Sequence, residues 1–333
     1  MTSLITVKSE GLYCEAGQFY IDPWRPVETA LITHAHSDHA YAGSEKYYAT
    51  AVSEGILRRR LGDIDLTGVE YGQRFKFGQT WVSFHPAGHV LGAAQVRVEK
   101  GDRVWVISGD YKRGLDPTCA PFEVVKCDTF ITEATFGLPI YQWEPGAVTA
   151  EQIYRWWQGD LERPSLLFCY AFGKAQRVLG ELTQLTDRPI YVHGAVHVLT
   201  EIYRQLGIAM VKTIPVSEMP RSHSFAGDLV IAPPSGHRSS WMKRFKRPQT
   251  AFASGWMAVR GARRRRGYER GFVLSDHADW PGLIKTVEQT KAKTVYVTHG
   301  QNDVLSRYLR EVLNLDAMPL DTLFEGEEDS SDL

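Results

Sequence analysis

Three histidines and an aspartate crowd into six residues near the start of the chain. They form the segment His34-Ala-His-Ser-Asp-His39, which directly follows a β-rich run at residues 29–33. Neutral imidazoles and carboxylates are ligands that suit Zn²⁺ or Mn²⁺. A loop after a strand can turn several such side chains towards one point, so the segment predicts a metal site. Two ions would need more than these four donors, and the others must come from elsewhere in the chain.

Further donors follow β-rich runs in distant parts of the sequence. His89, Asp110, Glu133, His277 and His299 each stand just past the end of such a run. Strand ends cluster along one edge of a sheet, where a rigid scaffold can hold donors from distant positions within a few ångströms of each other. The pattern therefore predicts a binuclear metal centre. Taken alone, His89, Asp110 or His299 would be interpreted as a hydrogen-bonded turn residue, so the prediction depends on the cluster.

Other polar residues near these runs are expected to play supporting or structural parts. Asp22, in Tyr-Ile-Asp-Pro, is expected to hold a ligand rather than bind a metal. His85 and His197 are interpreted as structural. His193 and His197 are spaced i,i+4, but no other donor converges on them.

Composition limits the class of protein. The 333 residues suffice for about two domains, and 43% hydrophobic with 23% charged residues is typical of a globular chain. The longest apolar stretch, 166–172, is far shorter than the roughly 20 residues of a bilayer-spanning helix. No apolar leader is visible at the N-terminus, so we expect a cytoplasmic protein with no membrane partner. The four cysteines lie too far apart for CxxC zinc spacing and are too few for a disulfide framework.

The elements that must position these residues fall into two textures. Short β-rich runs dominate the first 135 residues. From residue 145 onward, strand and helix patterns alternate, which favours βαβ units and a mostly parallel sheet. Thr149-Ala-Glu-Gln152 is a capping-box pattern and predicts a helix that opens there.

A basic segment between residues 238 and 270 suggests a polyanionic partner. It holds 11 Lys or Arg against one acid, Glu269, although the whole chain carries a net charge of -1. Such a run alone is more often a solvated face or a connector, but beside a metal cleft it favours phosphate contacts. Interleaved aromatic residues could stack on unpaired bases or pack in a core; they are Trp241, Phe245, Trp256 and Tyr268.

The motifs together resemble the β-CASP branch of the metallo-β-lactamase superfamily. The resemblance rests on His34-Ala-His-Ser-Asp-His39, Ala87-Gly-His-Val-Leu-Gly-Ala93, Ser108-Gly-Asp110, Thr132-Glu-Ala-Thr-Phe-Gly137, Ser275-Asp-His-Ala-Asp279 and Thr298-His-Gly300. It implies an α/β fold in which an αββα sandwich is interrupted by an inserted α/β β-CASP cap domain. The sandwich would comprise residues 1–145 and 262–333, and the cap residues 146–261.

The same resemblance implies a ligand set and catalytic roles. His34, His36, His89 and Asp110 would hold one divalent ion, Zn or Mn. Asp38, His39, Asp110 and His299 would hold the other, with Asp110 as the bridge. Asp38 is also expected to take part in catalysis, and Asp22 to support the metal loop. His277 would protonate the leaving sugar oxygen, with Glu133 orienting its imidazole; the alternative for His277 is a ligand or a structural histidine.

The resemblance also implies a nuclease, most like the bacterial DNA ligase-associated exonuclease group on the Artemis-like side of the branch. We expect cleavage of DNA from a 5′ end in DNA repair by a metal-bridging hydroxide, with functional association with a DNA ligase and a helicase. The residues expected to contact nucleic acid are Lys174, Lys243, Arg244, Ser254, Gly255, Arg260, Arg263, Arg264, Arg265 and Arg266.

Three other functions remain open from the sequence. An RNA-processing nuclease would use the same site, and a histidine at position 299 is the choice of the RNA-processing members of the branch. A small-molecule lactam or ester hydrolase is disfavoured by the insertion of roughly 115 residues and by the basic segment. A non-catalytic nucleic-acid-binding scaffold would gain nothing from paired metal ligands.

Overall fold

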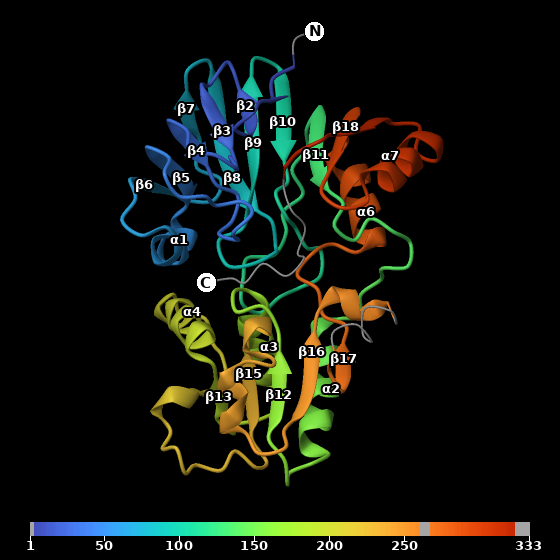
Figure 1. Ribbon diagram of the computed structural model, residues 1–333. Coiled ribbons are helices and arrows are strands. Elements are labelled where there is room, and N and C mark those ends of the chain that lie inside the picture. The colour runs from blue at the N-terminus through green and yellow to red at the C-terminus, as the bar shows by residue number, and fades with distance from the viewer. Residues whose placement is uncertain (1–2, 260–266, 324–333) are drawn as a thin grey trace. The chain divides into compact units, whose positions relative to one another are not determined.

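The computed structural model describes residues 3–259 and 267–323 (Figure 1). Within them the chain forms two compact units, which are described separately. The first unit contains residues 3–113, 119–142 and 277–323, and the second contains 114–118, 143–259 and 267–276. Among the described residues, no helix has the length and apolar composition needed to cross a bilayer.

Two mixed sheets build the first unit. One has six strands in the order β1 (Thr6–Val7), β2 (Leu12–Cys14), β3 (Phe19–Ile21), β4 (Thr29–Leu31), β5 (Lys46–Thr50) and β6 (Leu66–Val69). The other has seven strands in the order β19 (Asp316–Pro319), β18 (Thr294–Thr298), β11 (Thr129–Glu133), β10 (Arg103–Ile107), β9 (Ala94–Lys100), β8 (Thr80–Pro86) and β7 (Phe75–Phe77). The helices are α1 (Glu54–Leu61), α6 (Trp280–Thr290) and α7 (Asn302–Glu311).

The core of this unit lies between the two sheets. In β8, Val82 and Phe84 lie on one face and are fully buried, and on the other face Trp81 is 43% exposed while Ser83 is buried. Val82 and Phe84 belong to one apolar cluster with Phe19 and Ile21 of β3. Burial from both sheets gives a layered sandwich whose strand ends are held rigidly.

Strand direction decides where the polar residues meet. β10 pairs with β11 in parallel, and β11 pairs with β18 in parallel. Their carboxyl ends therefore point to the same edge of the sheet. Asp110 follows β10, Glu133 is the last residue of β11, and His299 follows β18. Three donors that are distant in sequence are thus brought to one edge.

A parallel sheet forms the second unit. Its strand order is β14 (Thr213–Pro215), β13 (Ile190–Val192), β15 (Leu229–Ala232), β12 (Ser165–Phe168), β16 (Gln249–Ala253) and β17 (Arg270–Phe272). Its helices are α2 (Gly146–Gln158), α3 (Lys174–Leu182) and α4 (Gly194–Gln205). Parallel neighbouring strands need a crossover connection, usually a helix. The alternation of strand and helix patterns in the sequence is therefore consistent with this parallel sheet.

Two details differ from the sequence expectations. β17 pairs in parallel with β16, so residues 267–276 belong to the second unit, whereas the expected cap ended at 261. The β-rich run before His277 predicts a strand, but so short a run does not indicate which of the two units' sheets it joins, and it pairs with β16 of the second unit. Helix α2 begins at Gly146 with Pro145 as N-cap, so the capping-box pattern at Thr149 lies inside the helix and does not start it.

Candidate metal centre

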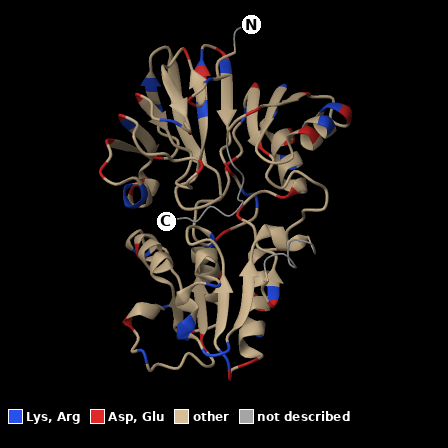
Figure 2. Cartoon of the chain, viewed as in Figure 1, with Lys and Arg blue, Asp and Glu red and all other residues tan. Residues whose placement is uncertain are grey.

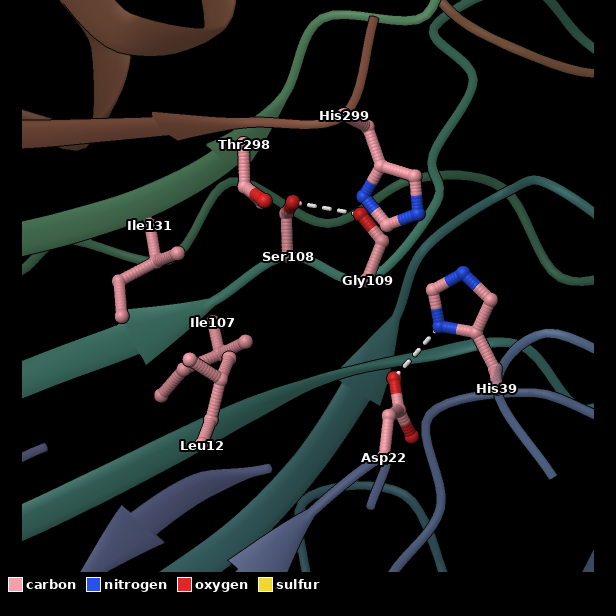
Figure 3. A pocket seen from close by; sticks show the side chains of 9 residues that line it. All are labelled: Leu12, Asp22, His39, Ile107, Ser108, Gly109, Ile131, Thr298 and His299. Atoms are coloured by element: carbon pink, nitrogen blue, oxygen red, sulfur yellow. Dashed lines mark hydrogen bonds and ion pairs between the residues drawn. The ribbon is translucent and has the colours of Figure 1, made fainter. Parts of the chain in front are cut away.

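The histidine-rich loop after β4 is fixed from behind by Asp22. This aspartate is 2% exposed and has a φ of 44°, so it turns its carboxylate inward. Its Oδ1 accepts a hydrogen bond from the Thr33 amide at 2.7 Å, and its Oδ2 accepts from His39 Nδ1 at 2.7 Å (Figure 3). The second bond leaves His39 Nε2 as the metal-facing nitrogen. Asp22 thus contacts His39, one of the expected ligands, and its supporting role stays a prediction.

The second sheet supplies donors through tight turns. Gly109 has a φ of 55°, and a Cβ there would lie 2.6 Å from Thr33 Oγ1, so only glycine allows the turn before Asp110 to approach the histidine loop. His299 has a φ of 59° directly after β18 and turns its ring towards His39 (Figure 3). The two rings are stacked, with centroids 5.1 Å apart.

One group of donors is formed by His34, His36, His89 and Asp110, all buried. His89 Nε2 lies 3.0 Å from His36 Nδ1, and Asp110 Oδ2 lies 3.4 Å from His34 Nε2 and 3.7 Å from His89 Nε2. Tetrahedral bonds of 2.0–2.1 Å place neighbouring ligand atoms roughly 3.3 Å apart. The separations therefore match the spacing of ligands around one small cation.

A second group shares the same aspartate. His39 Nε2 lies 3.6 Å from Asp110 Oδ2 and 3.7 Å from Asp38 Oδ2, and His299 completes a buried set with His39 and Asp110. Asp110 is 4% exposed, and its Oδ1 accepts no hydrogen bond from the described residues. A buried carboxylate oxygen of this kind is costly unless a cation satisfies it. The donors present would fit two divalent ions, with Asp110 as a member of both groups.

Glu133 and His277 form a hydrogen-bonded pair beside Asp110. Glu133 Oε2 lies 2.9 Å from His277 Nδ1, and Oε1 accepts from the Tyr111 amide at 2.8 Å. Both side chains are 1% exposed. These two residues and Asp110 also form a set that could hold a cation. However, the short bond to Glu133 occupies Nδ1, the ring nitrogen that lies 4.0 Å from Asp110 Oδ2.

Comparisons with known proteins show which proteins this chain is similar to. No family model matches the chain. This chain is 31% identical over 313 residues to a protein named "Probable DNA ligase" from Opitutus terrae. The aligned region covers 91% of this chain and 30% of that relative. The chain is 24% identical over 213 residues to an RNase J-like protein of Methanocaldococcus jannaschii, covering 54% of this chain and 50% of the relative. "Endoribonuclease YSH1" of Mycosarcoma maydis matches at 27% over 158 residues, 36% of this chain and 18% of that protein.

The motifs lie in the order expected from the resemblance. The probable DNA ligase matches over 91% of this chain, and the RNase J-like protein and the endoribonuclease match over shorter parts of it. The chain belongs to the β-CASP branch of the metallo-β-lactamase superfamily. The expected α/β fold class is confirmed as well. A protein of unknown function from Enterococcus faecalis V583 has the same fold, with a TM-score of 0.62 and 12% identity over 88% of this chain and 79% of that one. The chain spans half or less of the length of these curated relatives.

Burial lowers the pKa of two histidines in the donor groups of this β-CASP protein, His34 and His299. Burial lowers the pKa of His34 well below its ordinary value, and the neighbouring His39 adds to the effect. Burial also lowers the pKa of His299 to about 3. Both imidazoles are therefore neutral near pH 7, which is the form that binds a metal ion.

His39 behaves in the opposite way. Burial disfavours its charged form, but the carboxylates of Asp110, Asp38 and Asp22 outweigh burial and raise its pKa to about 10. In the metal-free protein, His39 therefore carries a proton at neutral pH. A metal ion must displace this proton to reach Nε2.

Metal affinity should consequently rise with pH. Because one proton leaves His39 for each metal bound there, we expect the apparent affinity for Mn²⁺ to increase at least about tenfold per pH unit between pH 6 and 8. Calorimetric titration in buffers of different ionisation enthalpy measures the released proton directly. His39→Asn should remove that share of the release, whereas a pH-independent affinity in the parent protein would contradict the assignment.

Two contacts near the histidine loop 34–39 and Glu133 were not predicted from the sequence. Arg60, at the basic end of α1 (Figure 2), donates a hydrogen bond to the carbonyl of Ala35, between His34 and His36. The Tyr111 amide is held by Glu133. The arginine run at 58–60 was a visible signal for the first contact, whereas a backbone donor leaves no trace in a sequence.

The structure disagrees with three expected nucleic-acid contacts. Lys174 is fully buried, and its Nζ lies 3.3 Å from Asp276 Oδ2, so its charge is already compensated inside the second unit. Ser254 is fully buried after β16, where its hydroxyl accepts from the Trp256 amide. Gly255 is also buried. Burial leaves none of the three open to a phosphate.

The remaining basic residues divide into described and undescribed positions. Lys243 is exposed, while Arg244 donates hydrogen bonds to the carbonyls of Met219 and Pro220. The other expected contacts lie outside the described residues; these are Arg260, Arg263, Arg264, Arg265 and Arg266.

The interleaved aromatic residues serve mainly as core. Phe245 is 5% exposed and belongs to the apolar cluster of the second unit. Trp241, Trp256 and Tyr268 are partly buried and pack against the same cluster. Base stacking by Phe245 is excluded by its burial.

Proposed function

We propose that this β-CASP protein is a metal-dependent nuclease that hydrolyses phosphodiester bonds of DNA, acting as an exonuclease from a 5′ end. The observation that carries the proposal is the pair of buried donor groups that share Asp110, with the Glu133–His277 pair beside them. A phosphodiester needs charge neutralisation, an activated water and a protonated leaving group. The residues present can supply or hold each of these.

The proposed roles divide among the chain's own residues. His34, His36, His89 and Asp110 would hold one divalent ion, and Asp38, His39, Asp110 and His299 the other. When bound, two such ions activate water and neutralise charge on the phosphate oxygens. Zn²⁺ and Mn²⁺ both suit a donor set of imidazoles and carboxylates without thiolates.

His277 and Glu133 would complete the reaction. His277 delivers a proton from Nε2 to the leaving sugar oxygen, because an alkoxide is a poor leaving group at neutral pH. Glu133 accepts the Nδ1 hydrogen bond, which fixes the ring and stabilises its charged form. Asp22 keeps His39 in the tautomer that presents Nε2.

DNA is favoured as the substrate by the similarity to a probable DNA ligase, which extends over 91% of this chain. That similarity also supports a proposed association with a DNA ligase in repair within the cytoplasm; a helicase partner rests on the family resemblance. RNA is the second candidate, because relatives named as ribonucleases match shorter parts of the chain and because His299 is present.

Matched DNA and RNA oligonucleotides of identical sequence decide between the two. Each would be tested under single-turnover conditions with Mn²⁺ and with Zn²⁺, with and without a 5′-phosphate. Faster cleavage of DNA that starts at the 5′ end supports the proposal. Preferential cleavage of RNA, or internal cuts independent of the end, would contradict it.

Salt dependence tests the basic segment. If six to ten phosphates are neutralised, affinity for an oligonucleotide should fall by about 10³- to 10⁵-fold between 50 and 200 mM salt. Binding is measured by fluorescence anisotropy with Ca²⁺ in place of the catalytic metal. A flat profile would show that residues 238–270 are not the binding surface.

A further inference from the structure

A buried ion cluster in the second unit surrounds the residue that precedes His277. Helix α3 (labelled in Figure 1) carries Lys174 and Arg177, which are 0% and 2% exposed, and Asp276 is 1% exposed. Lys174 Nζ lies 3.3 Å from Asp276 Oδ2, and Arg177 Nη1 lies 3.6 Å from Asp276 Oδ1. Two buried cations therefore act on the carboxylate adjacent to the proposed proton donor.

Arg177 also contacts other segments where the chain passes between the units. Its Nη1 donates a hydrogen bond of 2.7 Å to the carbonyl of Ser275, and its Nε lies 3.5 Å from Asp116 Oδ2. Glu181 Oε1 lies 4.0 Å from Nε. At Gly146, a Cβ would lie within 2.5 Å of both Glu181 Oε1 and Arg177 Nη2, so the start of α2 packs directly against the ends of these two side chains. Residues 114–118, 143–146 and 275–276 all adjoin passages between the units.

The chain is held equally firmly just after this point. The Ala278 amide donates to the Tyr111 carbonyl at 2.6 Å, and His277 Nδ1 is held by Glu133. The Ser275 carbonyl before His277 and the Ala278 amide after it are thus both fixed. Within the second unit a side chain holds the backbone just before His277, and within the first unit a main-chain bond holds it just after.

We infer that Lys174 and Arg177 are positioning residues that set the place of His277 through Ser275 and Asp276. The inference rests on the proposed role of His277 as proton donor. A purely stabilising role explains the cluster less well, because buried ion pairs lose much of their attraction to desolvation and apolar replacements are often neutral. In addition, the shortest bond of Arg177 goes to a main-chain carbonyl, which constrains the backbone rather than neutralising a charge. A displacement of 1 Å at a reacting group can cost about 100-fold in rate.

Two conservative variants test this role. Arg177→Lys keeps the charge but loses the planar fork that reaches Ser275 and Asp116; Asp276→Asn keeps the shape but removes the charge. We expect either variant to lower the single-turnover rate on an oligonucleotide about 10- to 100-fold. The rate on bis(4-nitrophenyl) phosphate should change less than about twofold, because a nitrophenolate leaves without a proton. Bound metal per chain should stay as in the parent protein.

Arg204→Lys is the matched control. Arg204 lies on α4 in the same unit, donates to the carbonyl of Val211 at 2.8 Å and pairs with Glu201 at 2.5 Å, so it has the same kinds of contact away from His277. Neither rate should change in this control. An equal loss on both substrates, or no loss in a folded Arg177→Lys protein, overturns the inference; if that variant does not fold, Asp276→Asn decides by the same criteria.

His277→Asn, measured alongside these variants, distinguishes failure of the positioning inference from failure of the proposed proton-donor role of His277. If it spares the aryl ester and slows the oligonucleotide while the Arg177 and Asp276 variants do not, only the positioning inference fails. If His277→Asn slows both substrates alike, the proposed proton donor is wrong and the inference falls with it.

Discussion

Asp110→Asn should lower the single-turnover rate of oligonucleotide cleavage by at least about 10³-fold, which corresponds to about 4 kcal/mol of transition-state stabilisation. The physical reason is that Asp110 is the one residue common to both donor groups. Its Oδ2 lies 3.4 Å from His34 Nε2 and 3.6 Å from His39 Nε2. An amide in its place keeps the shape but loses the negative charge on which both ions depend. Metal analysis should show fewer bound ions in the variant.

The matched control is Asp102→Asn, because Asp102 lies in the exposed turn between β9 and β10. It should keep full activity and metal content. Added Mn²⁺ should raise the melting temperature of the parent protein and of this control, because a ligand that binds only the folded state stabilises it. Full activity in a folded Asp110→Asn protein would contradict the shared-ligand assignment.

His277→Asn should lower oligonucleotide cleavage by about 10²- to 10⁴-fold, the usual contribution of a general acid. The expected loss on bis(4-nitrophenyl) phosphate is under about threefold, since nitrophenolate needs no protonation. Metal content should be unchanged, because the bond from Nδ1 to Glu133 places His277 beside the metal ligands rather than among them.

His85→Asn provides the control, because His85 is bonded to Ser83 and Glu123 in a part of the first unit that we interpret as structural. It should leave both rates unchanged. Loss of bound metal in His277→Asn would instead make His277 a ligand, which is the alternative raised by its sequence position and by its grouping with Asp110 and Glu133.

Much of the site could be predicted because its donors follow a regular rule. Parallel strands β10, β11 and β18 end at one edge, so Asp110, Glu133 and His299 had to converge once those runs were recognised as strands. The density of histidines at 34–39 supplied the other side. The sequence therefore identified these residues as donors, and their positions after parallel strands explained why they lie close together.

Residues whose role depends on a partner far along the chain could not be assigned in this way. Lys174 was expected to contact phosphate. In the structure its ammonium group forms an ion pair inside the second unit with Asp276, about a hundred residues later in the chain. Ser254 and Gly255 follow a strand, as the metal donors do, yet both are buried. Charge and position predict that a residue is functional, whereas burial decides which partner it serves.

The most direct test of the central claim is electron paramagnetic resonance of the protein reconstituted with Mn²⁺. The account predicts about two Mn²⁺ per chain, with the exchange-coupled spectrum of two ions that share a carboxylate, and loss of that coupling in Asp110→Asn. A spectrum of isolated Mn²⁺ ions in the parent protein, or less than one ion bound per chain, would contradict it.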